Sequence, residues 1–262
     1  MGHKTRLLTC WAIAAGSALG AMPCSALAAT AGSLPAERSR YDECVAATET
    51  DAEQAFEEAL IWRDQGGGSP AEHCVAIALL ALGAAEEAAI RLDALARENR
   101  GGTQEQRSDL MRQAGDAWLL ARRADLAEAT FSAALMLTPR DAEAWAARAR
   151  ARAMAGEWES AESDLDSAIT FDNARPEFYV LRSAVRDAAG KDDLAAHDIH
   201  TALEIDPNFP AALAERGLLR FAAGDEDGAR EDWVKVLNAA PESAAADVAR
   251  SGIERMEIRL EP

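Results

Sequence analysis

Small and large apolar residues recur along this chain at helical spacing. Ala161, Leu165 and Ala168 follow one another at intervals of four and three residues, which places them on one face of a helix. The same pattern returns every 34 residues, at Ala127, Phe131 and Ala134, at Ala195, Ile199 and Ala202, and at Ala229, Trp233 and Val236. The pattern therefore predicts a series of amphipathic helices that repeat one structural unit.

Turn-forming residues divide each repeat into two helices. A glycine lies in the middle of the repeat, where the chain must reverse, and a proline or asparagine ends the second helix. The glycines are Gly156, Gly190 and Gly224, and the terminal residues are Pro139, Asn173, Pro207 and Pro241. A single hairpin cannot bury its apolar faces alone, so we expect the hairpins to stack against one another.

The period sets the expected boundaries. An array over residues 69–243 divides into blocks 69–102, 108–141, 142–175, 176–209 and 210–243, with a short insertion at 103–107. Residues 29–68 are expected to form a degenerate N-terminal helical hairpin. Residues 244–262 are expected to form a C-terminal capping helix that shields the last stack.

These features resemble the tetratricopeptide repeat (TPR) family. The 34-residue period is joined by Trp145 and Tyr179 at block position 4 and by Gly217 at position 8. The resemblance covers residues 69–243 well and the first hairpin poorly, and Asn173 stands where proline is usual. It implies an all-α, right-handed superhelical solenoid of antiparallel helix pairs whose first helices line a concave groove. It also implies a protein that binds other proteins or peptides and is not an enzyme.

The first 28 residues have the pattern of a signal peptide. Basic Lys4 and Arg6 precede an apolar run, and Ala26 and Ala28 form an A-x-A cleavage pattern. We therefore expect export to the periplasm, with secretion as the alternative. No later stretch has the length of a transmembrane segment.

Composition and charge limit the classes of molecule that this protein is expected to bind. The 262 residues are 49% hydrophobic and carry a formal net charge of −18, with 27 Lys plus Arg against 45 Asp plus Glu. This charge argues against nucleic-acid binding, which requires a basic face to meet the phosphates.

Two cysteines remain after removal of the signal peptide, Cys44 and Cys74. In an oxidising compartment the pair predicts one disulfide. However, matching Ala52 to Ala88 aligns Cys44 with Leu80, and six residues along a helix is ~9 Å, more than a disulfide tolerates. The bridge therefore requires the first helix to slide, tilt or end early.

Arginine and aspartate recur together at two block positions. Arg148, Arg182 and Arg216 occupy position 7, and Asp164, Asp198 and Asp232 occupy position 23. Because the two positions are equidistant from the turn, they face each other across the hairpin. We interpret them as structural ion pairs rather than as a ladder for a ligand.

No catalytic, metal or cofactor site is predicted. The sequence has no Ser/His/Asp arrangement and no phosphate-binding glycine loop, and His197 and His200 have no third ligand nearby.

The binding site is expected in the groove, at positions 2, 5, 9, 12 and 13 of the first helices. Two arginines in its middle would meet an acidic group of a partner. The expected groove residues are His73, Ile77, Leu80, Arg112, Asp116, Leu119, Ala146, Arg150, Met154, Val180, Ala184, Asp187, Leu218 and Phe221. The leading hypothesis is a non-enzymatic scaffold of the cell envelope. The alternative is a carrier or chaperone that holds an apolar peptide or small molecule inside the superhelix.

Overall fold

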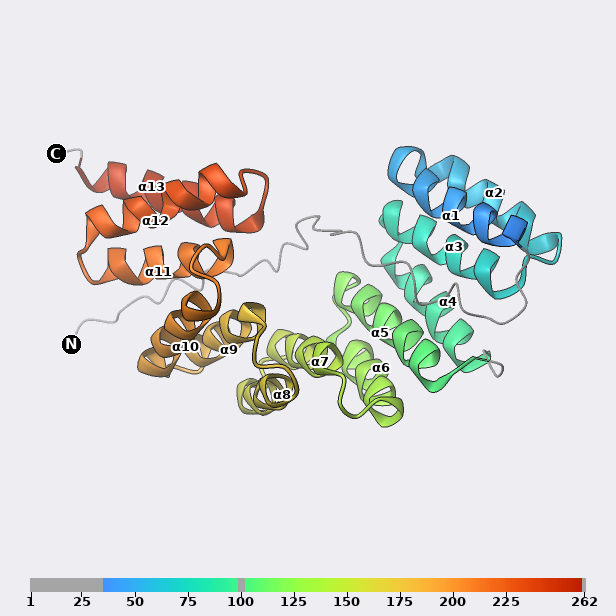
Figure 1. Ribbon diagram of the computed structural model, residues 1–262, viewed down its shortest axis with the longest axis horizontal. Helices are drawn as coiled ribbons and strands as arrows, with labels where there is room; N and C mark the ends of the chain where they lie inside the picture. Colours follow the sequence, from blue (N-terminus) through green and yellow to red (C-terminus); the bar gives the residue numbers. More distant parts are fainter. Residues whose placement is uncertain (1–34, 99–101, 261–262) are drawn as a thin grey trace. The chain divides into compact units, whose positions relative to one another are not determined.

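The structure is a computed structural model, and it describes residues 35–98 and 102–260. The predicted signal peptide, residues 1–28, lies outside the described residues. Those residues form α-helices joined by short turns and contain no strand, which confirms the all-α fold class. On each side of α10, neighbouring helices along the chain pack against each other, as α5 does against α6 and α11 against α12 (Figure 1).

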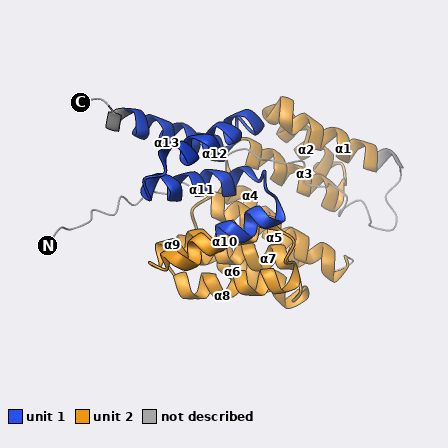
Figure 2. Cartoon of the chain, turned by 60° about the vertical axis from the view of Figure 1, so that its left-hand side comes forward, with its two compact units in different colours: residues 1–22, 199–262 blue, residues 23–198 orange. Residues whose placement is uncertain are grey.

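Packing divides the described chain into two compact units, residues 35–198 and 199–260 (Figure 2). We describe each unit by itself. The division falls inside helix α10, Asp192–Ile205.

The first unit contains successive helix pairs. Its helices are α1 (Pro35–Thr50), α2 (Ala52–Asp64), α3 (Gly68–Ala81), α4 (Ala85–Glu98), α5 (Gln104–Leu120), α6 (Ala124–Leu137), α7 (Ala142–Met154), α8 (Trp158–Phe171), α9 (Pro176–Ala188) and the first half of α10. From α3 onward, each odd-numbered helix is the first helix of a predicted block and the next is the second.

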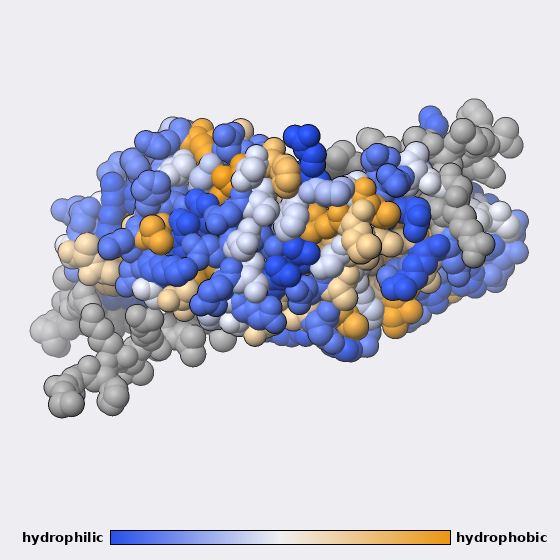
Figure 3. Space-filling model, turned by 90° about the horizontal axis from the view of Figure 1, so that it is seen from below, coloured by the Kyte–Doolittle hydropathy of each residue, from blue (hydrophilic) through white to orange (hydrophobic). Residues whose placement is uncertain are grey.

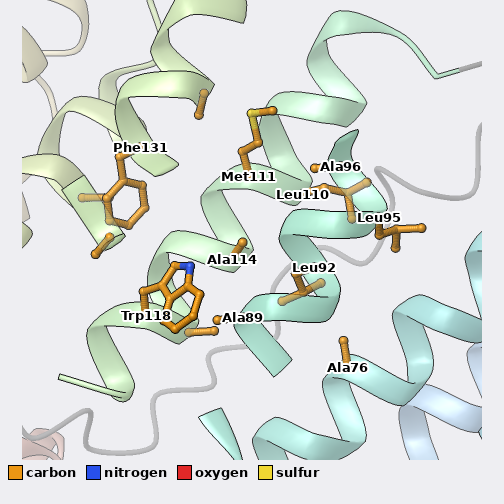
Figure 4. Packing of buried hydrophobic residues seen from close by; sticks show 14 of the residues in the cluster. Ala76, Ala89, Leu92, Leu95, Ala96, Leu110, Met111, Ala114, Trp118 and Phe131 are labelled. Atoms are coloured by element: carbon orange, nitrogen blue, oxygen red, sulfur yellow. The ribbon is translucent and has the colours of Figure 1, made fainter. Parts of the chain in front are cut away.

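The core of this unit follows the predicted apolar positions. Leu92 of α4, Leu110 of α5 and Phe131 of α6 are fully buried in one cluster with several alanines (Figure 4). The alanines at the first position of the pattern, such as Ala127 and Ala161, have no exposed surface. A larger side chain there would separate two helix backbones, so small residues set the spacing of the helices.

The turns between paired helices use the left-handed backbone region. Gly156 has φ of +81° between α7 and α8, a conformation that glycine adopts without a steric cost. Arg122 occupies the equivalent position in block 108–141 and has φ of +58°. The turn is therefore kept even where the sequence does not supply glycine.

Most of the expected insertion at 103–107 belongs to helix α5. Thr103 caps α5: its side chain accepts from the backbone N–H of Gln106, and the Gln106 side chain accepts from the backbone N–H of Thr103. This capping box satisfies two N–H groups at the helix start. It extends α5 by one turn beyond the block boundary at residue 108.

Helix α1 is longer than the repeat predicts. Only Asp51 separates it from α2, and Asp51 caps α2 by accepting from the backbone N–H of Gln54 at 3.0 Å. Residues 46–48 align with the turn at 82–84, yet they remain helical, because this segment contains no glycine to break the helix. Of the three alternatives that would allow the disulfide, that the first helix slides, tilts or ends early, the early end is therefore wrong.

The second unit contains the end of α10 and three further helices, α11 (Pro210–Ala222), α12 (Glu226–Ala239) and α13 (Ala244–Leu260). Trp233 of α12 is fully buried where these three helices meet. Glycine is required on both sides of its ring. A Cβ at Gly217 would lie 2.3 Å from the Trp233 Nε1, and one at Gly252 would lie 2.4 Å from Cζ2.

Candidate interaction surface

Three of the predicted groove residues are buried. His73, Ala146 and Val180 have exposed fractions of only 3, 3 and 5%. All three occupy block position 5, and Ala214 at the same position is also buried. Position 5 therefore belongs to the core between helices and not to an open groove, which corrects the prediction for these residues. Arg112, also at position 5, is half-buried and has a side chain long enough to reach the surface.

The other predicted groove positions remain partly accessible. In the first unit, six of these residues on α3, α5 and α7 are half-buried, and they include both apolar and charged side chains. They are Ile77, Leu80, Asp116, Leu119, Arg150 and Met154. We call these six residues the first-helix face. On α9, Ala184 is half-buried and Asp187 is exposed. Leu218 and Phe221 are half-buried on α11 of the second unit.

The two groove arginines do not form a free cationic pair. Arg150 binds Asp116 at 2.9 Å, and Arg112 lies 3.8 Å from the Asp109 carboxylate. Burial raises the pKa of Asp116, although Arg150 and Arg112 oppose this shift. Arg150 therefore already has an anionic partner within the chain, and the expectation that one acidic group of a binding partner meets both arginines stays a prediction.

The arginines and aspartates of the repeat meet within each hairpin. Arg148 donates two hydrogen bonds to Asp164, at 2.9 and 2.8 Å. Arg182 binds Asp198 at 3.0 and 2.7 Å, and Arg216 binds Asp232 at 2.9 and 2.7 Å, with the same geometry. The three aspartates are almost completely buried. The bidentate contacts supply the hydrogen bonds that a buried carboxylate requires.

Each of the three buried aspartates also binds a second arginine, which was not predicted from the sequence. Arg152 lies 2.9 Å from Asp164, Arg186 lies 2.8 Å from Asp198, and Arg220 lies 2.9 Å from Asp232. The signal was present, because these three residues share block position 11 in the same blocks.

These arginines also join neighbouring helix pairs. Arg152 binds Glu128 of the preceding block at 2.9 Å, and Arg186 binds Glu162 at 2.8 Å. Arg182 binds Asp166 of the preceding block at 2.6 Å. In the first unit, the ionic network therefore connects successive repeats in addition to closing each hairpin.

Block 69–102 has the charges reversed. Arg91, on the second helix, occupies the position that is aspartate in the last three blocks, and it binds Glu72 of the first helix at 2.9 Å. It also binds Glu87 one turn earlier at 2.9 Å. The repeat pattern predicts no pair in this block, whereas the structure forms an ion pair of opposite polarity.

His73 forms a buried polar network between three helices. Its Nδ1 lies 2.6 Å from the Tyr41 hydroxyl of α1, and its Nε2 lies 2.7 Å from Oε1 of Gln113 of α5. Because Oε1 only accepts, Nε2 carries the proton and Nδ1 accepts from Tyr41. Burial lowers the pKa of His73 to about 4, so the ring is neutral near pH 7.

The two cysteines are joined. Cys44 of α1 and Cys74 of α3 form a disulfide with a Cα–Cα distance of 6.4 Å, within the usual range of ~4.4–6.8 Å. The bridge spans 30 residues of sequence. It lies next to the Tyr41–His73 hydrogen bond, so a covalent and a polar link connect the same two helices.

The histidines and acidic residues form no metal-ligand cluster in the part of the chain that the structure describes. Among the described residues, no three His, Cys, Asp or Glu side chains gather in a way that could hold a metal ion. His200 instead lies 3.3 Å from Glu204 on the same helix. Within the same residues, none of the helices combines the length and the apolar character needed to cross a membrane.

One face of the molecule is mostly polar. On the face shown in Figure 3, hydrophilic residues predominate, and hydrophobic residues gather mainly right of the centre, with a few smaller groups elsewhere. The most exposed large apolar side chain among the described residues is Met136 of α6, at 84%. Single apolar residues of this kind are normal on protein surfaces.

The helix pairs define the class of protein as an α-solenoid. Several solved structures that resemble this chain are TPR proteins. TTC0263 of Thermus thermophilus has a TM-score of 0.58 at 18% identity, and the match covers 71% of this chain and 99% of that one. MamA from Desulfovibrio magneticus RS-1 has a TM-score of 0.53 at 18% identity, covering 67% and 97%. The chain therefore has the TPR fold.

A third similar structure is YrrB, described as a TPR protein with an unusual peptide-binding site. Its TM-score is 0.52 at 16% identity, and the match covers 65% of this chain and 86% of YrrB. Neither a protein-family model nor a curated protein sequence matches this chain. At these identities the likeness defines the fold alone.

Proposed function

We propose that this protein is a non-enzymatic interaction scaffold of the cell envelope that binds a segment of another protein on the first-helix face. The observation that carries this proposal is the combination of half-buried apolar side chains on successive first helices, Leu80 of α3, Leu119 of α5 and Met154 of α7. Leu80 and Leu119 already pack partly against the core cluster. Such side chains can bury further surface against a partner without reorganising the helices.

Charged residues on the first-helix face and beside it indicate which charges a binding partner would carry. Asp116 and Arg150 neutralise each other at 2.9 Å, so an apolar segment can cover them without leaving one charge unpaired. Arg112 is the cation that we expect to meet an acidic side chain of the partner, because its distance to Asp109 is 3.8 Å. The proposed partner is thus an extended or helical segment with apolar anchors and one carboxylate.

Two observations support the envelope setting. The sequence begins with a signal-peptide pattern at residues 1–28, and Cys44 and Cys74 form a disulfide, which is typical of oxidising compartments. Peptide binding is supported by YrrB, which shares the fold and is described as having a peptide-binding site.

The envelope location is tested by fractionating cells that express the full chain. Recovery of the protein only from the cytoplasm would contradict this location.

Site-specific photo-cross-linking tests the binding surface. A photoreactive residue replaces Leu119 on the first-helix face, and a matched variant carries it at Ile90, an exposed position on the second helix α4. We expect a discrete cross-linked protein from position 119 in living cells and none from position 90. The same product from both positions, or from position 90 alone, would contradict the proposal.

The anionic contact is tested separately. Once the cross-linked segment is identified, Arg112→Glu should weaken its binding more than Arg97→Glu, an exposed arginine on α4. Equal binding by the two variants would reject the role of Arg112.

A further inference from the structure

Helix α1 does not continue the regular stacking of the first helices. In the regular part of the array, Asp116 of α5 contacts Arg150 of α7, and both occupy block position 9. Tyr41 and Cys44 of α1 align with Ile77 and Leu80, yet they contact His73 and Cys74 of α3. These contacts are displaced by four and six residues, which is ~6–9 Å along a helix. Helix α1 is therefore shifted along α3 by more than one turn.

Few apolar side chains hold α1 in this shifted position. Of its residues with described side chains, only Tyr41 and Thr48 are buried, while Cys44, Val45 and Ala47 are half-buried. The remaining side chains are mainly charged and exposed. The exposed Arg40 lies over the ring of Trp62 of α2 at 5.2 Å, and Trp62 itself is buried. The buried apolar area of α1 is thus small for a helix of 16 residues.

Two specific links take the place of apolar packing. The disulfide and the Tyr41–His73 hydrogen bond join α1 to adjacent residues of α3, His73 and Cys74, which are 3% and 0% exposed. Removing the covalent link leaves the hydrogen bond, the contacts of exposed Arg40 with Trp62 and Gln65, and a few apolar contacts to order the helix. That is a weak basis for docking, because ordering a helix has a large entropic cost.

We propose that α1 is a redox-controlled lid, docked on α3 while Cys44 and Cys74 are bonded and released when a dithiol reductant cleaves the bond. Release uncovers His73 and Cys74 in the middle of α3, the first helix of the predicted array. This inference does not depend on the identity of the partner in the proposed function.

The exposure of the two sulfurs defines the exchange reaction. The residue Cys44 is half-buried and Cys74 is fully buried, so we expect the thiolate to attack at Cys44. The S–S bond breaks, Cys74 leaves as a thiolate and takes a proton from water, and a mixed disulfide forms at Cys44. The second thiol of the reductant displaces Cys44, which leaves as a thiol. Two electrons pass from the dithiol to the protein, and the reductant becomes a disulfide.

Hydrogen–deuterium exchange of the full chain tests this inference, with dithiothreitol as the reductant and alkylation followed by mass measurement to establish the thiol state. After reduction we expect amides of residues 38–50 to exchange about a hundredfold faster, while residues 52–98 and 244–257 stay protected. Unchanged exchange in 38–50 after complete reduction would overturn the inference. So would a loss of protection throughout 52–98, since the bridge would then hold the whole region and not a lid.

Two variants keep the test independent of the reductant. The double variant Cys44→Ala/Cys74→Ala should show the rapid exchange of 38–50 without dithiothreitol. Tyr41→Phe keeps the bridge and the ring but loses the hydrogen bond, and its α1 should stay docked until reduction. Slow exchange in the double variant, or free thiols in the protein purified without reductant, would also overturn the inference.

Discussion

Helices α1 and α13 are the first and last helices of the described chain, and they are attached to their neighbours in different ways. Helix α13 buries Ala246, Ala249, Gly252 and Met256, spaced three or four residues apart, and Gly252 lies against the Trp233 ring. Helix α1 buries only Tyr41 and Thr48 among its described side chains and relies on a disulfide and a hydrogen bond. The comparison shows that a terminal helix can be docked by a continuous apolar seam or by a few specific links.

The largest expected effect concerns the apolar seam of α13. Trp233→Ala removes a fully buried side chain between three helices, so we expect the free energy of unfolding of residues 199–260 to fall by about 3–5 kcal/mol. Urea unfolding followed by circular dichroism measures the change. The neighbouring Val234→Ala, at a position 44% exposed, serves as the control and should change it by less than about 0.5 kcal/mol. A mild effect of Trp233→Ala would contradict the role of the seam.

A somewhat smaller effect is expected between the ends, where ionic links join the repeats. Asp164→Ala leaves Arg148 and Arg152 without their shared partner, which should cost about 3 kcal/mol of the free energy of unfolding. Adding Arg148→Ala should then cost little more, because the lost interaction is the same. Simple additivity of the two losses in a double-mutant cycle would reject the pairing. The exposed Glu159→Ala, on the same helix α8, is the control.

Acid should loosen α1 and leave α13 unaffected. The folded-state pKa of His73 is about 4, below its ordinary value of 6.5, so the unfolded chain binds the proton more readily. The contribution of neutral His73 is fully present above pH 6.5 and is lost as the pH falls towards 4. Between pH 7 and pH 5 the loss is about 2 kcal/mol.

Urea midpoints at these two pH values measure the effect of His73. In His73→Gln the part of the pH dependence due to this residue should disappear, whereas the exposed His197→Gln should retain it. Equal pH dependence in the wild type and His73→Gln would contradict the assignment.

The smallest expected loss of unfolding free energy comes from removing a helix cap, and it should be equal for helix α2, next to α1, and helix α12, next to α13. Asp51 caps α2 at 3.0 Å from the Gln54 nitrogen, and Asp225 caps α12 at 3.0 Å from the Gly228 nitrogen. Replacing either aspartate by alanine should reduce the free energy of unfolding by about 1 kcal/mol. Thermal unfolding of both variants checks this. A loss several times larger at one cap would show that local capping, and not the mode of docking, distinguishes the ends.

The repeat pattern predicted the helices well because its physical cause is local. Ala161, Leu165 and Ala168 lie on one helix face whatever the rest of the chain does, and all three are buried. Position 5 was harder to assign, because its burial depends on how closely neighbouring first helices approach. Val180 and Ala146 consequently lie in the core and not in the groove.

Contacts between repeats were the least predictable part of the site. The pairing of Arg150 with Asp116 neutralises a residue that the sequence pattern assigned to a partner. The reversed pair of Arg91 and Glu72 follows no repeated pattern and needs the three-dimensional structure. The disulfide depends on the shift of α1, which results from a helix that continues past the expected turn.

Fluorine NMR of the full chain labelled with 5-fluorotryptophan tests the contrast between the ends most directly. Trp62 of α2 packs in the cluster that includes Tyr41, and Trp233 reports on the seam of α13. In a urea titration, dithiothreitol should lower the midpoint reported by Trp62, because α2 loses the packing of α1, and leave the Trp233 midpoint unchanged. Equal shifts at both tryptophans, or none at Trp62, would contradict the account.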